Sequence, residues 1–443
     1  MPPDAPHVLL VNPWIHDFAA YDFWAKPLGL LTLAAILRQA GFAISYVDCL
    51  DRFHPLEAKS DPFARCGRGP YRKTGIPKPP GLADVPRRFS RYGIRPEWLR
   101  RDLADLPKPD LILLGSMMTY WYPGVAETAQ ALRSAYGDIP ILLGGIYATL
   151  CPDHARRCIG AHRVLSGSAS DSIARIAGDL TGWPAGPSPG EDMDAVPLPA
   201  VDLQRRVGYV PLLTSRGCPF SCEYCASGLL EPRRSRRSVE SVVEEIKRRY
   251  RDLGVVDFVF YDDALLVDAE THAVPLFESL IEADLPVRFH TPNALHIRAI
   301  SEPLARLMKR VGFHTLRLGL ETAEGPGPRL DRKVTEEEFF RAAGALKKAG
   351  FGKDQVGAYL LVGLPGQRIG DVLASISVVQ KTGIRPIPAY YSPIPGTGLW
   401  PEAVRASRYP LEADPVYTNN AVLPCWDAFR WETVTRIKEA AGR

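Results

Sequence analysis

The first part of the chain alternates short apolar runs with segments in which apolar residues recur on a helical period. The expected strands are 7–12, 43–48, 110–115, 140–145 and a shorter 163–166, and the expected helices are 28–40 and 125–136. Strands that are apolar on both faces and alternate with helices form a parallel sheet covered on both sides. The pattern predicts a doubly wound, Rossmann-like domain over about residues 1–180, with its ligand beyond the carboxyl ends of the strands.

The second part repeats the alternation. Its expected strands are 209–215, 257–261, 287–290, 315–320, 355–362 and, less clearly, 388–391. A helix capped by Ser238 and ended by Gly254 follows the first of them. Six such units predict a partial (β/α)6 barrel over about residues 207–400, with its active site at the carboxyl ends of the strands. Residues 401–443 form a short tail with an amphipathic helix expected at 427–441.

Two stretches interrupt these patterns. Residues 51–107 are rich in Pro, Gly and Arg, and their scattered aromatic residues indicate a partly ordered insert within the first domain. Residues 181–206 begin with a Pro- and Gly-rich, aperiodic run, which is typical of a linker between domains.

Composition narrows the class of protein. A chain of 443 residues suggests two or three domains, and a net charge of +4 gives no argument for a nucleic-acid partner. The longest apolar run, 28–37, is too short to span a bilayer, and no signal-peptide pattern precedes the first strand. We therefore expect a cytoplasmic protein whose eight cysteines are reduced thiols or metal ligands.

Three of those cysteines, Cys218, Cys222 and Cys225, lie in a C-x3-C-x2-C pattern directly after a predicted strand. Thiolates hold zinc or iron–sulfur clusters, and an ordinary four-iron cluster or a closed zinc site needs four ligands. Three ligands in one loop leave one iron of a four-iron cluster free to bind a further molecule. The alternative is a zinc site closed by Cys151, Cys158 or Cys425, although structural zinc sites usually pair C-x2-C units.

This cysteine spacing, with Tyr224 before the third cysteine, resembles the radical S-adenosylmethionine (radical SAM) superfamily. The resemblance implies a [4Fe-4S] cluster whose open iron binds the amino and carboxylate groups of SAM, and reductive cleavage to a 5′-deoxyadenosyl radical. By position in the family's motifs, the implied SAM-binding residues are Tyr224, Asp262, Asp263, Asn293, Glu321 and Gly363. Arg332 and Lys333 also match a pair that recurs after the fourth strand in relatives.

The first domain, with Pro27 and Gly29 opening its first helix, resembles the cobalamin (B12)-binding domain that precedes many radical SAM cores. The residues that the resemblance implies for cobalamin are Thr119, Tyr120, Trp121, Gly144, Gly145 and Thr149. The family's Asp-x-His-x-x-Gly motif is incomplete, because Trp14 and Ala19 stand around His16 in place of the Asp and Gly. We expect cobalt to receive no histidine from this protein. The aromatic loop could cover the lower face of the corrin or pack between the domains.

The leading hypothesis is a cobalamin-dependent radical SAM methyltransferase acting at an unactivated carbon of a small-molecule or peptide substrate. One alternative is a radical SAM enzyme that performs rearrangement, cyclisation or oxidation without cobalamin. Another is a non-enzymatic corrinoid-binding or redox-sensing protein. The family resemblance also implies an electron donor such as flavodoxin or ferredoxin. The basic run at 233–237 is either a solvated surface or a docking patch for that donor.

Overall fold

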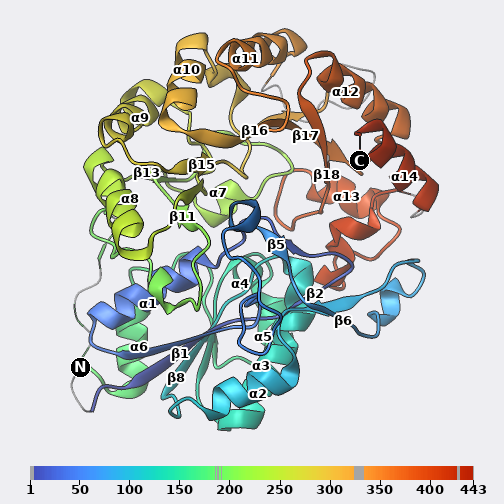
Figure 1. Cartoon of the computed structure of the whole chain (residues 1–443). Helices are drawn as coiled ribbons and strands as arrows, with labels where there is room; N and C mark the ends of the chain where they lie inside the picture. The colour runs from blue at the N-terminus through green and yellow to red at the C-terminus, as the bar shows by residue number, and fades with distance from the viewer. Residues whose placement is uncertain are drawn as a thin grey trace. The chain divides into compact units, whose positions relative to one another are not determined.

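The computed structural model describes residues 4–184, 186, 189–190, 192–323, 334–426 and 430–442. The chain forms two compact units, one of Met1–Gly208 with Ala413–Tyr417 and one of Tyr209–Glu412 with Thr418–Arg443. Each unit contains its own parallel sheet with helices packed on it (Figure 1). No helix in the described part of the chain is long and apolar enough to cross a membrane.

The first unit is built on a five-stranded parallel sheet with the order β10-β9-β8-β1-β4. Its strands are β1 (His7–Asn12), β4 (Ala43–Asp48), β8 (Leu111–Leu114), β9 (Ile141–Leu143) and β10 (Arg163–Val164). In sequence order this arrangement is 5-4-3-1-2, so the strand order reverses between β1 and β8. The doubly wound sheet predicted from the sequence is confirmed, and the reversal is the position at which such sheets bind ligands.

The apolar runs exist because both faces of this sheet are buried. Val8 and Leu10 of β1 pack with α1 (Leu28–Gln39) and α6 (Ile173–Thr181) on one face. Leu9 and Val11 point to the other face. That face is covered by α2 (Pro96–Ala104), α3 (Tyr122–Tyr136), α4 (Ile146–Leu150) and α5 (Pro152–Ile159). The sequence pattern did not indicate α6.

The insert is more ordered than its sequence suggests. It contributes β5 (Gly69–Pro70), β6 (Lys73–Gly75), β7 (Ser90–Tyr92) and α2. These strands pair with two strands of the loop that follows β1, namely β2 (Ile15–Asp17) and β3 (Tyr21–Asp22), in sheets of order β2-β7-β6 and β3-β5. The insert is therefore attached to the loop at the carboxyl end of β1.

The second unit is built on a six-stranded parallel sheet in chain order, β11-β14-β15-β16-β17-β18. The strands are β11 (Val210–Leu212), β14 (Asp257–Phe260), β15 (Arg288–His290), β16 (Phe313–Glu321), β17 (Val356–Val362) and β18 (Arg385–Tyr390). Pro386 and Pro388 fit in β18 because it is an edge strand, where missing N–H donors are tolerated. All six predicted strands are present, and the sheet is that of a partial barrel.

Helices follow the strands and cover the outer face of the sheet in order (Figure 1). They are α8 (Val239–Leu253), α9 (Ala273–Glu282), α10 (Glu302–Val311), α11 (Glu336–Lys348) and α12 (Ile369–Lys381). The end of the chain adds α13 (Trp400–Ala406) and α14 (Trp431–Ala440), and α14 packs on α12, where Gln380 donates to the carbonyl of Ala440 at 2.6 Å. Arg332 and Lys333 lie outside the described residues.

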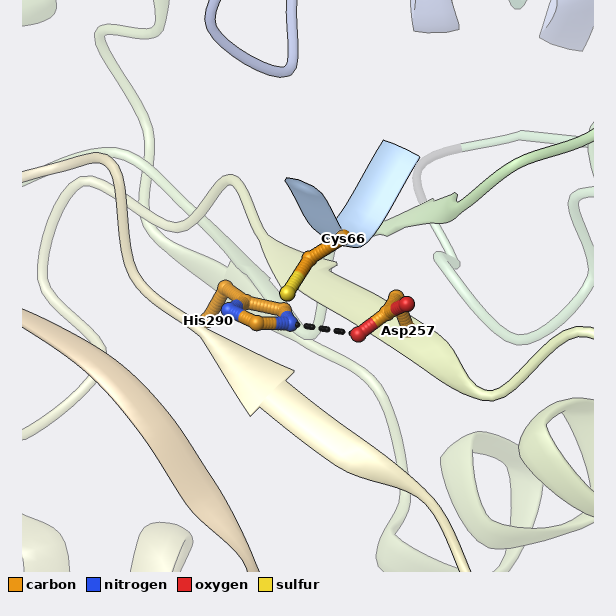
Figure 2. Close-up of side chains that lie close together, drawn as sticks. All are labelled: Cys66, Asp257 and His290. Carbon is orange, nitrogen blue, oxygen red and sulfur yellow. Dashed lines mark hydrogen bonds and ion pairs between the residues drawn. The ribbon is translucent and has the colours of Figure 1, made fainter. Parts of the chain in front are cut away.

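The opposite, inner face of the second sheet carries charged residues. Asp257, at the start of β14, is fully buried and accepts two hydrogen bonds from Arg288, at 2.7 and 2.8 Å. Nε2 of His290 lies 2.9 Å from the same carboxylate (Figure 2). Burial raises the pKa of Asp257, but the hydrogen bonds from His290 and Arg288 outweigh burial and lower it. Asp257 and Arg288 begin their strands, and His290 is the last residue of β15.

Candidate functional site

The three cysteines lie on a loop whose two ends are joined by a short antiparallel ladder. That ladder consists of β12 (Ser215–Arg216) and β13 (Ser235–Arg236), which pair in register. Gly217 opens the loop with φ of +74°, and a Cβ there would lie 2.8 Å from the carbonyl oxygen of Arg233. Only glycine combines this backbone conformation with so close an approach. The loop is thus closed at its base, so its thiols are presented from one short, pinned segment.

None of the three cysteines of the loop forms a disulfide, and Cys218 and Cys222 are half-buried while Cys225 is exposed. A turn brings the last two cysteines together, since the N–H of Cys225 donates to the carbonyl of Cys222 at 3.0 Å. Three cysteine sulfurs on one loop fit a cluster with one open iron. Cys425 is a poor fourth ligand, because burial raises the pKa of its thiol to about 12.

A short helix, α7 (Ser227–Leu230), follows the third cysteine directly. The backbone N–H of Ser227 donates to Sγ of Cys225 at 3.4 Å, and the Cys225 thiol donates to the Ser227 hydroxyl at 3.3 Å. Burial raises the pKa of Asp263, and a hydrogen bond from Ser227 opposes that rise. Burial, opposed by Arg216 and reinforced by Asp263, also raises the pKa of Glu231. Two carboxyl groups therefore lie beside the cysteine loop, and the sequence indicated only Asp263.

The two adjacent acids after β14 have different surroundings. Asp262 is buried and accepts hydrogen bonds from the hydroxyls of Thr214 and Ser215 at 2.7 and 2.6 Å. It also accepts the backbone N–H of Thr214 at 3.2 Å, while His272 lies 2.9 Å from the Thr214 hydroxyl. Asp262 therefore anchors the stem of the cysteine loop. Asp263 is the acid of this pair that lies beside the loop itself.

The other strand ends carry the remaining predicted residues. Asn293, after β15, donates to the carbonyl of Tyr261 at 2.8 Å and so ties two strand ends together. Glu321 ends β16 with φ of +65°, beside a register shift in the pairing with β17. A non-glycine residue in the left-handed region is strained, and such strain concentrates at functional sites. Tyr224 is half-buried on the cysteine loop.

The loop after β17 is held by one side chain that the sequence did not single out for this purpose. Oε1 of Gln367 accepts the N–H groups of Gly363 and Leu364 at 2.8 and 3.3 Å, and its Nε2 donates to the carbonyl of Leu361 at 2.9 Å. Gly363 has φ of +95°, and a Cβ there would lie 2.8 Å from the side chain of Leu423. These hydrogen bonds fix the shape of the loop that contains Gly363, a residue that the family resemblance implies for SAM.

In the first unit, the loops after β8 and β9 meet at the carboxyl edge of the sheet. The Ser116 hydroxyl donates to the carbonyl of Gly144 at 2.7 Å, and the N–H of Ile146 donates to the carbonyl of Ser116 at 3.0 Å. A Cβ on Gly145 would lie 2.1 Å from the Ser116 carbonyl oxygen, whereas a Cβ on Gly144 would meet no atom within 4 Å. Gly145 is thus required for packing, and Gly144 faces open space that a ligand could approach.

The other residues predicted for cobalamin have identified surroundings. Thr149 accepts the N–H of Gly167 at 2.9 Å and donates to the carbonyl of Gly145 at 2.9 Å. Thr119 and Tyr120 are buried. Nε1 of Trp121 donates to the buried carboxylate of Asp17 at 2.6 Å. The aromatic loop is therefore fixed against β2 and is not a free flap.

His16 lies on β2 and is buried. Its Nε2 lies 2.8 Å from Oε2 of Glu127 on α3, and Arg91 of β7 forms an ion pair with the same carboxylate. A histidine that ligates a metal needs a free ring nitrogen, with the other nitrogen held by a partner. The ion pair with Glu127 directs this imidazole toward α3.

The basic run at 233–237 is largely engaged within its own unit. Arg234 and Arg236 both form ion pairs with Asp268, at 3.3 and 3.1 Å. Arg237 is buried and forms an ion pair with Glu245 at 2.5 Å. These partners offset much of the positive charge that suggested a docking patch.

Comparison with known proteins agrees with this arrangement. Residues 212–379 match the family model described as the Radical SAM superfamily. An uncharacterised methyltransferase of Pyrococcus horikoshii is 29% identical over 342 residues, which are 68% of this chain and 72% of that protein. Cytidylyl-2-hydroxyethylphosphonate methyltransferase of Streptomyces wedmorensis is 24% identical over 454 residues, covering 90% of this chain and 82% of that protein.

A solved structure shows the same fold over most of the chain. It is TsrM from Kitasatospora setae, a radical SAM methyltransferase with tryptophan and a SAM analogue bound. The TM-score is 0.66 at 16% identity, and the match covers 90% of this chain and 76% of that chain. The three-cysteine loop, the partial barrel and the family match over residues 212–379 identify a radical SAM domain in the second unit, and the fold over most of the chain is similar to that of TsrM.

Proposed function

We propose that the protein is a cobalamin-dependent radical SAM methyltransferase that acts at an unactivated carbon of a small molecule. The observation that carries the proposal is the loop that holds Cys218, Cys222 and Cys225 and is closed at its base by the pairing of β12 with β13. Asp263, which follows β14, lies beside this loop. When bound there, a [4Fe-4S] cluster would supply the electron for SAM cleavage. Methyltransferases that match both halves of the chain support methyl transfer as the outcome.

In this proposal the protein's own residues have separate tasks. The three cysteine thiolates hold the cluster. Asp262 fixes the base of the loop by accepting the hydrogen bond from the Thr214 hydroxyl. Asp263 and Glu321 are acceptors for the positively charged methionyl end and the ribose of SAM. Asn293, Tyr224 and the Gly363 loop shape the rest of that site.

We assign cobalamin to the carboxyl edge of the first sheet, at Gly144, Gly145, Thr149 and the loop 116–124. The open space at Gly144 and the position of this edge beside the strand-order reversal support the assignment. Because Trp14 and Ala19 stand in place of the Asp and Gly of the family's histidine motif, we expect cobalt to have no protein histidine ligand. Trp121, held by Asp17, is the side chain that we expect to cover the lower face.

A low-potential donor such as flavodoxin or ferredoxin would supply the electron. Its docking surface is not assigned to the arginine run, because Asp268 and Glu245 engage three of those side chains. We place the protein in the cytoplasm, where such donors and reduced thiols occur together.

One experiment tests the proposal as a whole. The protein is purified anaerobically, its cluster is reconstituted with cobalamin present, and iron, cobalt and 5′-deoxyadenosine after dithionite reduction are measured. Alanine at Cys218, Cys222 or Cys225 should abolish 5′-deoxyadenosine, while the control Cys158→Ala, an exposed cysteine of the other unit, should not. SAM cleavage by a triple-alanine variant would contradict the assignment of the cluster.

A second candidate is a radical SAM enzyme that does not use cobalamin. The observation in its favour is the incomplete histidine motif, with Trp14 and Ala19 around His16 in place of the Asp and Gly. Iron and 5′-deoxyadenosine without any retained cobalt would establish this alternative.

A further inference from the structure

His154 and Cys158 lie one turn apart on α5, in the unit that does not contain the cysteine loop. Residues at positions i and i+4 of a helix share one face. Sγ of Cys158 lies 3.5 Å from Nε2 of His154. Cys158 is exposed and His154 is half-buried, so solvent reaches the sulfur. A soft sulfur donor and an imidazole nitrogen are therefore already side by side at the surface.

The spacing of these two atoms is that of two ligands on one tetrahedral ion. In zinc sites the metal lies about 2.3 Å from a cysteine sulfur and about 2.0–2.1 Å from a histidine nitrogen. At the tetrahedral angle these bond lengths place the two ligand atoms about 3.5 Å apart. An ion can therefore replace the hydrogen between Sγ and Nε2 without a movement of α5.

His154 also has the support at its other ring nitrogen that a metal ligand needs. Nδ1 lies 2.7 Å from the hydroxyl oxygen of Tyr147, whose side chain is fully buried. The Tyr122 ring packs edge-on against the imidazole at a centroid distance of 4.6 Å, and its own hydroxyl donates to Asp414 at 2.8 Å. A histidine that binds metal through one nitrogen commonly bonds a fixed partner through the other. These contacts hold the ring with Nε2 directed toward Cys158.

Binding of a cation here displaces a proton. Burial and the nearby Asp414 raise the pKa of the Cys158 thiol, and Arg157 opposes the rise. Burial lowers the pKa of His154, so the imidazole is neutral near pH 7. With Nε2 on the ion, the ring hydrogen lies on Nδ1 and the Tyr147 oxygen accepts it. The thiol proton goes to solvent, so one proton is released for each ion that binds.

We propose that His154 and Cys158 form a surface site for a thiophilic divalent cation such as Zn²⁺, whose remaining coordination positions are filled by water. The inference does not depend on the proposed function, because neither residue belongs to the unit that holds the three cluster cysteines. A closed structural zinc site has four protein ligands, whereas this pair supplies two. We therefore expect an ion that exchanges with solvent.

The test is an anaerobic titration with Co²⁺ of the full-length Cys218→Ala/Cys222→Ala/Cys225→Ala protein, in which the cluster thiols cannot contribute. A thiolate bound to Co²⁺ gives a sulfur-to-metal charge-transfer band, which reports the sulfur directly. We expect this band, the release of one proton per ion, and loss of the band when Zn²⁺ is added. Cys158→Ser should abolish the band, and His154→Ala should weaken Co²⁺ binding by roughly tenfold or more.

Two further variants separate this site from other thiols. Cys151→Ser, at the half-buried cysteine that precedes α5, is the matched control and should keep the band. Tyr147→Phe removes only the partner of Nδ1 and should weaken binding by about tenfold. Absence of the band, a band that survives Cys158→Ser, or unchanged affinity in His154→Ala would overturn the inference.

A second measurement uses the reconstituted wild-type protein, in which the cluster occupies its own cysteines. After incubation with Zn²⁺ and gel filtration, it should retain one more zinc per chain than Cys158→Ser does. Equal zinc content in the two proteins would overturn the inference. Iron content and SAM cleavage, which test the proposed function, are measured separately and do not enter this comparison.

Discussion

At the scale of single residues, two adjacent acids have different tasks that a variant pair can separate. Asp263→Asn should weaken SAM binding by about 1–3 kcal/mol and leave the cluster intact, because it removes one charge-assisted partner. Glu321→Gln should behave in the same way. SAM affinity measured anaerobically and iron content check both, with Glu302→Gln on exposed α10 as the control. Unchanged affinity in both variants would contradict their assignment to SAM.

The neighbouring Asp262 should give the opposite result. Replacing it with Ala leaves the buried Thr214 and Ser215 donors without their acceptor, which costs about 1–3 kcal/mol. The loop stem should loosen, so Asp262→Ala should lose iron on gel filtration while Asp263→Asn retains it. Retention of a full cluster in Asp262→Ala would show that the stem does not depend on this network.

A third residue prediction concerns pH. Asp51 forms an ion pair with Arg205, which also bonds Asp102. Burial and the nearby Asp48 raise the pKa of Asp51, and Arg205 opposes the rise. A carboxyl group whose pKa is higher in the folded than in the unfolded protein stabilises the folded state at low pH. This stabilisation is fully present below the unfolded-state pKa, near 3.9, and is lost as the pH rises through the folded-state pKa.

Arg205→Gln removes the opposing charge, so the pKa of Asp51 should rise further. The variant should lose about 1 kcal/mol of unfolding free energy at pH 7, a modest loss because the Arg205 side chain is 45% exposed. The loss should be smaller at pH 4, where Asp51 is more often protonated and attracts Arg205 less. Denaturant unfolding at the two pH values measures the difference. Arg206→Gln, at the adjacent exposed arginine, is the control. A larger loss of unfolding free energy at pH 4 than at pH 7 would contradict the predicted pH dependence.

At the scale of elements, the cysteine loop depends on Gly217. Gly217→Ala should cost about 1–2 kcal/mol in the left-handed conformation and bring Cβ to 2.8 Å from the Arg233 carbonyl oxygen. The loop should therefore hold iron poorly. The matched control is Gly228→Ala in α7, where a Cβ meets no atom within 4 Å. Equal iron content in the two variants would contradict the role of Gly217.

The elements also show what the sequence could predict. β1 and β8 were predicted correctly because both faces of the sheet are buried, which leaves an uninterrupted apolar run. The partly ordered insert was predicted but its strands were not, because β5 and β6 have two and three residues and pair with segments distant in sequence. Local pattern carries no signal for such pairing.

The residues of the candidate site also differ in whether the sequence alone could reveal them. Cysteine spacing and the acid after β14 are local signals, so the sequence contains them. Asp262 and Asp263 are identical residues side by side, and only the fold shows that one serves the loop stem. Ser227 and Glu231 belong to no motif, and their position beside the loop follows from α7. Likewise, the partner of His16 is Glu127, far along the chain.

At the scale of the whole molecule, cobalamin and cluster binding should be separable, because they are assigned to different units. Gly144→Val would place its Cβ where no atom lies within 4 Å and extend two methyl groups into the space assigned to cobalamin. We expect several-fold less retained cobalt with normal iron and normal 5′-deoxyadenosine. Gly344→Val on α11, also in open space, is the control. A normal amount of retained cobalt in Gly144→Val would contradict the assignment of cobalamin to this edge of the sheet.

The most direct test of the central claim is the electron paramagnetic resonance spectrum of the Co(II) form after reconstitution with cobalamin. We predict retained cobalt whose signal shows no nitrogen superhyperfine splitting and is unchanged in His16→Ala, because Trp14 and Ala19 replace the Asp and Gly of the family's histidine motif. Failure to retain cobalt, or a splitting that vanishes in His16→Ala, would contradict this account.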